Sequence, residues 1–214
     1  PALFHAPRRG TPSFCYRDRV LDGMAELFRL FQLPEEHLRR PLFATVLVEN
    51  AIVLLTGTYG TGKTQLVHLL NRLFFSNGQG GYEFDYESCH QELTAFDVLY
   101  HLDLAELQRG KEVVHPKRMI TARLKFLNEI QRANTAFFNA LLPLFAERQV
   151  TYRDFEWSVP EFICFMDRNP LDSGSSELPE AFADRIDYSF EIPAVHLDEH
   201  LRLLDLRRTG SGFV

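Results

Sequence analysis

A run of five apolar residues, Ala51-Ile-Val-Leu-Leu55, leads directly into a glycine-rich turn. No polar side chain interrupts the run, so neither face of it suits contact with water, as is typical of a central strand in a parallel sheet. After the turn, residues 64–75 place leucines, among them Leu66 and Leu70, on one helical face. The order of buried strand, glycine turn and amphipathic helix favours the α/β class.

The turn fits the pattern G-x-x-x-x-G-K-[ST], which binds phosphate. Its glycines let backbone N–H groups point at a phosphate, and the helix N-terminus adds a positive dipole. In this pattern Lys63 reaches the β- and γ-phosphates, and Thr64 places its hydroxyl on Mg²⁺. The alternative, a glycine-rich surface turn, does not account for the flanking strand and helix. The predicted ligands are therefore ATP or ADP with Mg²⁺, held by Gly57, Thr58, Tyr59, Gly60, Thr61, Gly62, Lys63 and Thr64.

A second strand, predicted over residues 121–128, ends on a polar pair. Glu129 is the candidate base that orients an attacking water, because transfer of a phosphoryl group to water needs such a residue. Asn128 stands where an aspartate is expected, and its carbonyl could still accept a hydrogen bond from a metal-bound water. The alternative is a helix start, with Asn128 as the cap and Glu129 in the first turn.

A third apolar strand, Phe162–Met166, is followed by Asn169 and Pro170. An amide just beyond a central strand can reach the γ-phosphate or the attacking water. Asn-Pro is also a strong turn dipeptide, so a plain turn is the alternative. The phosphate loop upstream favours the functional interpretation of Asn169.

Together these segments resemble the MoxR branch of the AAA+ ATPases from about Val46 to Pro193. The resemblance rests on the phosphate loop and on four later segments in a fixed order. These are Phe126-Leu-Asn-Glu-Ile-Gln-Arg-Ala133, Glu147-Arg-Gln-Val-Thr151, Asn169-Pro170 and Leu178-Pro-Glu-Ala-Phe-Ala-Asp-Arg185.

The resemblance implies an α/β AAA+ core, with a five-stranded parallel sheet of order 5-1-4-3-2 flanked by helices. It implies Lys63 and Thr64 as Walker A residues, Glu129 as the Walker B base and Asn169 as sensor 1. Arg185 becomes the candidate arginine finger that acts on a neighbouring subunit; Arg148 is the less favoured alternative. The implied partners are further copies of the chain in a ring, expected to be a hexamer, and a protein client. A von Willebrand A-domain protein is an expected partner as well.

The chain departs from the family pattern at Asn128, which is neutral, and after Pro193, where 21 residues remain. The helical lid is therefore expected to be largely absent. The expected organisation is an N-terminal arm over 1–16, the ATPase core over 17–195, and the start of a lid or a tail over 196–214.

The composition of the chain disfavours several other classes of function. A net charge of −6 disfavours nucleic acid as a partner, and no apolar run is long enough to span a membrane. Three widely spaced cysteines are typical of reduced thiols in a cytoplasmic protein. His196-Leu-Asp-Glu-His200 fits a zinc-peptidase pattern, but no third ligand follows it, so a solvated helix is expected.

The leading hypothesis is a ring-forming ATPase that remodels a protein partner. A second is a nucleotide-dependent assembly scaffold with little or no hydrolysis, which the neutral Asn128 favours. A metabolic kinase is a third, disfavoured because Glu129 at a strand end suits the activation of water.

Overall fold

The computed structural model describes most of the region expected to form the ATPase core. The described residues are 41–42, 44–45, 48, 50–72, 84–170 and 177–194. The arm expected over 1–16 and the region 196–214, with its His-x-x-Glu-His pattern, lie outside them.

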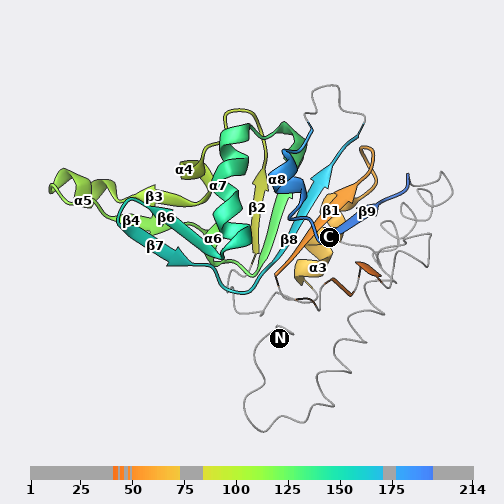
Figure 1. The fold of residues 1–214 in the computed structure, drawn as a ribbon, viewed down its shortest axis with the longest axis horizontal. Coiled ribbons are helices and arrows are strands. Elements are labelled where there is room, and N and C mark those ends of the chain that lie inside the picture. Colours follow the sequence, from red (N-terminus) through yellow and green to blue (C-terminus); the bar gives the residue numbers. More distant parts are fainter. Residues whose placement is uncertain are drawn as a thin grey trace, which may run out of the picture.

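Five parallel strands form the central sheet (Figure 1), in the order β2-β5-β8-β1-β9. Numbered by their order along the chain within this sheet, they read 2-3-4-1-5, which confirms the predicted order 5-1-4-3-2. The strands are β1 (Ala51–Thr56), β2 (Phe84–Ser88), β5 (Leu124–Asn128), β8 (Ile163–Arg168) and β9 (Tyr188–Glu191).

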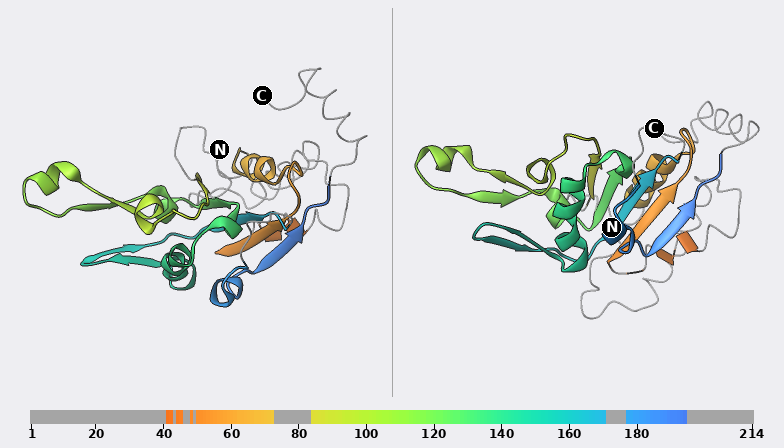
Figure 2. Two further views of the ribbon diagram at one scale, coloured as in Figure 1. Left: turned by 90° about the horizontal axis from the view of Figure 1, so that it is seen from above. Right: turned by 45° about the horizontal axis from the view of Figure 1, so that its top comes forward.

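Helices cover both faces of the sheet (Figure 2). Helix α3 (Lys63–Leu70) lies on one face, and α7 (Thr135–Ala146) and α8 (Glu180–Ala183) lie on the other. The three central strands, β1, β5 and β8, bury side chains on both faces: in β5, Phe126 packs in the cluster under α3, whereas Leu127 packs in the cluster under α7. This two-sided burial explains why β1 and most of β8 read as continuous apolar runs.

The central strand β5 carries a charged residue in the core. Lys125 in β5 is fully buried, and its Nζ donates to the carbonyl of Ala122 at 2.5 Å and lies 5.0 Å from the centre of the Phe162 ring. Burial lowers the pKa of the Lys125 ammonium to about 8, although Cys164 and Asp85 oppose that change. The lysine thus occupies the core with its charge directed at backbone carbonyls.

Two hairpins project from the same side of the sheet (Figure 1). The first lies within residues 88–118, and the second turns at Arg153-Asp154. The first joins β3 (Tyr100–Leu102) to β4 (Val114–Pro116) through α5 (Leu104–Gln108), and the second joins β6 (Gln149–Tyr152) to β7 (Phe155–Ser158). The short helices α4 (Ala95–Val98) and α6 (Arg118–Thr121) flank the first hairpin.

Aromatic rings and an ion pair connect the two hairpins. The rings of Tyr100 and Tyr152 lie 4.7 Å apart between centroids, and Phe96 meets both rings edge-on. Beyond them, Arg153 donates to the carboxylate of Glu112 at 2.6 Å. The two hairpins are therefore joined by a ring contact and by an ion pair.

None of the helices in the described ranges combines the length and the apolar composition needed to cross a membrane.

Candidate functional site

The glycine-rich loop joins β1 to α3 in the geometry of an anion site. Gly60 and Gly62 adopt left-handed backbone conformations, with φ of 78° and 82°, which residues with a Cβ rarely adopt. Gly62 caps α3 without a side chain, and the first turn of α3 carries no acidic residue. The positive end of the helix dipole is therefore available to a phosphate group.

Gly57 is required for a different reason, which is close packing. A Cβ at this position would lie 2.7 Å from the backbone oxygen of Ile192, just beyond β9. The backbone N–H of Gly57 also donates to the carbonyl of Arg168 at the end of β8, at 3.1 Å. The start of the loop is thus fixed between two neighbouring strands.

Lys63 is held inside the loop. Its Nζ donates to the carbonyls of Gly57 and Thr58, at 2.8 and 3.0 Å, and only 7% of the residue is exposed. Burial lowers the pKa of the Lys63 ammonium, and the carboxylates of Asp167 and Glu129 oppose this shift. The lysine is positioned where an anion bound by the loop would meet its charge.

Asp167, near the end of β8, lies at the centre of the polar groups. Its Oδ2 lies 3.9 Å from the Nζ of Lys63, and its Oδ1 accepts the backbone N–H of Glu129 at 2.5 Å. Burial raises the pKa of the Asp167 carboxyl, while the N–H of Glu129 and the charge of Lys63 act in the opposite direction. Sequence reasoning did not identify this residue as part of the site.

Thr64 and Asn128, the two residues expected to bind a metal, contact one another. The Thr64 hydroxyl donates to Oδ1 of Asn128 at 3.3 Å, which joins the start of α3 to the end of β5. Asn128 contributes an oxygen donor and no charge.

Glu129 has a left-handed backbone, with φ of 54° and ψ of 49°, and it precedes the short helix η2 (Ile130–Arg132). Its carboxylate forms an ion pair of 2.7 Å with Arg132. Arg132 also donates to the hydroxyl of Tyr59 at 2.7 Å, so it connects Glu129 to the loop. A non-glycine residue in this conformation costs free energy, and such strain occurs most often at functional sites.

Asn169 follows β8 directly and is 3% exposed. It comes two residues after Asp167 and one residue after Arg168, whose carbonyl binds the loop. The structure therefore brings together the loop and the ends of β5 and β8, with every predicted residue of the site except Arg185.

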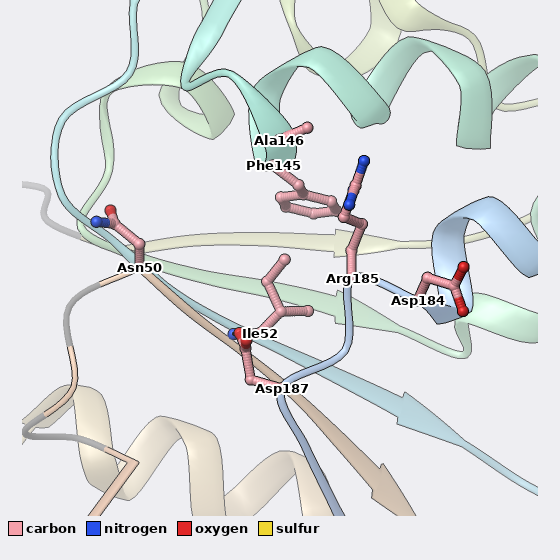
Figure 3. Close-up of a pocket in the computed structure, with 7 residues that line it drawn as sticks. All are labelled: Asn50, Ile52, Phe145, Ala146, Asp184, Arg185 and Asp187. Atoms are coloured by element: carbon pink, nitrogen blue, oxygen red, sulfur yellow. The ribbon is translucent and has the colours of Figure 1, made fainter.

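Arg185 lies elsewhere, in a pocket of about 310 Å³ at the start of β1 (Figure 3). The pocket is lined by Asn50, Ile52, Phe145, Ala146, Asp184, Arg185 and Asp187. Asp187 fixes this region, because its Oδ2 accepts the backbone N–H of Ile52 at 2.8 Å. The phosphate loop begins at the other end of the six-residue strand β1, and such a strand is about 20 Å long. Arg185 is exposed and does not belong to the loop site of its own chain.

The oxygen donors of this site suit a nucleotide bound together with Mg²⁺ better than a metal ion bound alone. Within the residues described, no cluster of three or more histidine, cysteine, aspartate or glutamate side chains could hold a metal. The hydroxyl of Thr64, the amide oxygen of Asn128 and the carboxylate of Asp167 are hard oxygen donors of the kind that Mg²⁺ prefers. Because Mg²⁺ commonly takes only one or two protein ligands beside substrate phosphates, this set is sufficient for Mg²⁺–nucleotide.

Comparison with protein families decides the assignment. Residues 52–186, more than half of the chain, match the model of the AAA domain (dynein-related subfamily). The chain belongs to this family. The AAA domain contains the loop, the ends of β5 and β8, and Arg185.

Two MoxR proteins are similar to this AAA domain. The protein from Methylorubrum extorquens is 32% identical over 136 residues, which cover 62% of this chain and 38% of that protein. The protein from Paracoccus denitrificans is 30% identical over 153 residues, which cover 68% of this chain and 43% of that protein. The chain thus spans about two fifths of the length of these curated relatives. The resemblance to the MoxR branch is confirmed.

A solved structure from Cytophaga hutchinsonii, described as a candidate ATPase, has the same fold. The superposition covers 92% of this chain and 57% of that protein, with a TM-score of 0.66 and 22% sequence identity. This likeness confirms the α/β fold of the core.

Sequence reasoning missed two contributors to the site. Asp167 had a visible signal, since it is a lone carboxylate at the end of the apolar run Phe162–Met166. Arg132 lies in the segment that carries the resemblance, but its contact with Tyr59 joins positions 73 residues apart. Only the folded chain reveals that contact.

Proposed function

We propose that the AAA domain of this chain binds ATP with Mg²⁺ and hydrolyses it to ADP and phosphate. The observation that carries this proposal is the position of Lys63, held by loop carbonyls beside the N-terminus of α3 and next to Asp167. Loop, lysine and strand-end carboxylate together form the arrangement that phosphoryl transfer requires.

In the proposed reaction the loop binds and orients the phosphates. The backbone N–H groups of the loop and the N-terminus of α3 face the phosphate oxygens, and Lys63 neutralises the β- and γ-phosphates. When bound, Mg²⁺ draws negative charge from the phosphate oxygens. Thr64 and Asn128, 3.3 Å apart, are the residues that would hold it.

Glu129 acts as the base that orients the attacking water. Its carboxylate is 18% exposed and is held by Arg132, so it has a defined direction at the edge of the site. Asn169, buried at the end of β8, is placed to contact the γ-phosphate or the water. These two roles follow from the chemistry of the side chains and from the family resemblance.

Assembly into a ring, with a hexamer as the expected size, completes the proposal. Arg185 is exposed and about one strand length from the loop of its own chain, which supports action at the site of a neighbouring subunit. Cycles of hydrolysis in the ring would remodel a protein client, with a von Willebrand A-domain protein as a possible partner and the cytoplasm as the location.

One observation favours a second candidate function. Asn128 is neutral, whereas a negatively charged carboxylate at its position would strengthen metal binding. The neutral side chain favours a nucleotide-dependent assembly scaffold with little hydrolysis. The two candidates share nucleotide binding and differ in turnover. Glu129→Gln separates them: in an ATPase it keeps ATP binding and abolishes phosphate release, whereas in a scaffold the wild type itself releases little phosphate.

The test of nucleotide binding is thermal stabilisation. ATP with Mg²⁺ at about 100 times its dissociation constant should stabilise the wild type by about 2.7 kcal/mol. Lys63→Ala should remove this shift, and Lys111→Ala, at an exposed lysine of the first hairpin, should keep it. An equal shift in Lys63→Ala and the wild type would overturn the proposal.

The shared site has its own test. Arg185→Ala and Lys63→Ala should each be inactive, and a mixture should regain activity, because some interfaces then pair an intact loop with an intact arginine. An arginine supplied by a neighbour commonly contributes about 10³–10⁵ in rate. A mixture as inactive as its components, with mixed oligomers verified, would contradict action between subunits.

A further inference from the structure

Asp167 lies on the strand next to Asn128, at the corresponding level of the sheet. Strands β5 and β8 pair in parallel with Leu127 beside Met166, so the next residues along, Asn128 and Asp167, are neighbours. Alternation along each strand places both on the face covered by α3, because Phe126 and Phe165, two residues earlier, pack in the cluster under α3.

The contacts of the two side chains agree with this placement. Asn128 meets Thr64 at 3.3 Å, and Asp167 meets Lys63 at 3.9 Å. Thr64 and Lys63 are adjacent at the start of α3. The amide and the carboxylate therefore face the same two residues of the phosphate loop from adjacent strands.

The charge of the site is unevenly distributed between these two strands. The amide oxygen of Asn128 can bind a metal ion but does not balance the positive charge of that ion. Asp167 carries a carboxylate, and only 5% of the residue is exposed. Mg²⁺ beside a nucleotide is usually bound through one or two carboxylates. Lys63 has other acceptors in the carbonyls of Gly57 and Thr58, so Asp167 is not needed to hold it in place.

We propose that Asp167, from β8, supplies the negative charge that Asn128 lacks, so that the carboxylate serving the Mg²⁺ of the nucleotide site has moved from β5 to the adjacent strand. This inference rests on the proposed nucleotide binding. It makes Asp167 a positioning residue for the metal, acting beside Thr64 and Asn128. It also accounts for a buried carboxylate whose pKa is raised by burial and which a divalent cation would stabilise in its charged form.

The experiment measures the affinity for a fluorescent ATP analogue in EDTA and in saturating Mg²⁺, so hydrolysis is not the readout. In the wild type Mg²⁺ should tighten binding. Asp167→Asn should reduce that gain by about 10–100-fold, the usual effect of losing a residue that supports a metal ligand. Affinity in EDTA should not fall, because Lys63 keeps its contacts with the loop carbonyls.

The rescue variant makes the test specific. Asn128→Asp combined with Asp167→Asn returns the carboxylate to β5 and should restore the gain from Mg²⁺. Asp85→Asn is the matched control, since Asp85 is a sheet carboxylate beside Lys125 whose pKa is likewise raised by burial. This control should leave the gain unchanged. Thermal melts of each variant verify that the fold is retained.

Two outcomes would overturn the inference. If Asp167→Asn weakens binding equally with and without Mg²⁺, and Asn128→Asp does not rescue it, Asp167 only orders Lys63 and Glu129. If the gain from Mg²⁺ is unchanged, Asp167 has no role toward the metal. Failure of the proposed function looks different, because the wild type would then bind no nucleotide in either condition.

Discussion

Gly57→Ala should destabilise the fold, mainly through the contact of the added Cβ with Ile192. Gly57 does not have the positive φ found at Gly60, Gly62 and Gly110, so its backbone accepts alanine. The added Cβ would meet the backbone oxygen of Ile192 at 2.7 Å, whereas ordinary van der Waals contact begins at 3.4 Å. The end of β9 must therefore retreat by about 0.7 Å.

A hydrogen bond opposes this movement of the end of β9. The backbone N–H of Ile192 donates to the carbonyl of Thr56 at 2.7 Å, and this hydrogen bond holds the end of β9 against β1. Forcing one extra carbon into such packing typically costs about 1–3 kcal/mol. In a domain of this size the melting temperature should fall by about 2–12 °C.

Urea unfolding monitored by circular dichroism measures this loss, and two other glycines provide the controls. Gly60 and Gly110 both have left-handed φ and no atom within 4 Å of an added Cβ, so alanine at either should cost about 1–2 kcal/mol from backbone strain alone. Of these two control variants, only Gly60→Ala should also weaken nucleotide binding, because Gly110 lies after α5 in the first hairpin. A Gly57→Ala protein as stable as the wild type would refute the reasoning.

Three further predictions concern the core and the hairpins. Between about pH 8 and pH 10.5 the stability of the wild type should rise relative to that of Lys125→Met, because buried Lys125 is then neutral in the folded chain while the unfolded chain still binds the proton; a difference between their urea midpoints that does not change with pH would contradict this. Phe137→Ala, at a position 1% exposed under the sheet, should cost about 3–5 kcal/mol in the same assay, and a loss below 1 kcal/mol would contradict its place in the core. Arg153→Gln should leave the urea midpoint unchanged, because its partner Glu112 is also partly exposed; a clear loss would show that this ion pair holds the hairpins together.

The central part of the fold was predictable because its signals are local. Strand β1, the loop and α3 follow one another within 20 residues, and each carries its own pattern: an apolar run, paired glycines and helical periodicity. The apolar run of β8 was equally clear, since that strand is buried on two faces. The strand order came from the family resemblance, because apolar patterning does not determine which strands are neighbours.

The first hairpin was not predictable from pattern. Strands β3 and β4 have three residues each, too few to display an alternation. Their stability derives from distant contacts, such as the ring of Tyr100 against Tyr152. Residues so far apart in sequence leave no periodic signal.

The sequence pointed to the loop and to the end of β5 as the candidate site, but it did not point to Asp167. Its importance depends on β8 lying between β5 and β1, which brings its carboxylate to Lys63 from more than 100 residues away. A lone aspartate in an apolar strand could have been noted as unusual. Its partner could be identified only from the fold.

The position of β1 in the middle of the sheet has a consequence for synthesis of the chain. Its two neighbours, β8 and β9, are translated more than 100 residues later, and the N–H of Gly57 binds the carbonyl of Arg168. At about 5–20 residues per second, the ribosome needs roughly 6–20 s to reach Arg168 after Gly57. During that interval β1 is an unpaired apolar segment, so the nascent chain is most prone to aggregation before its phosphate loop can form.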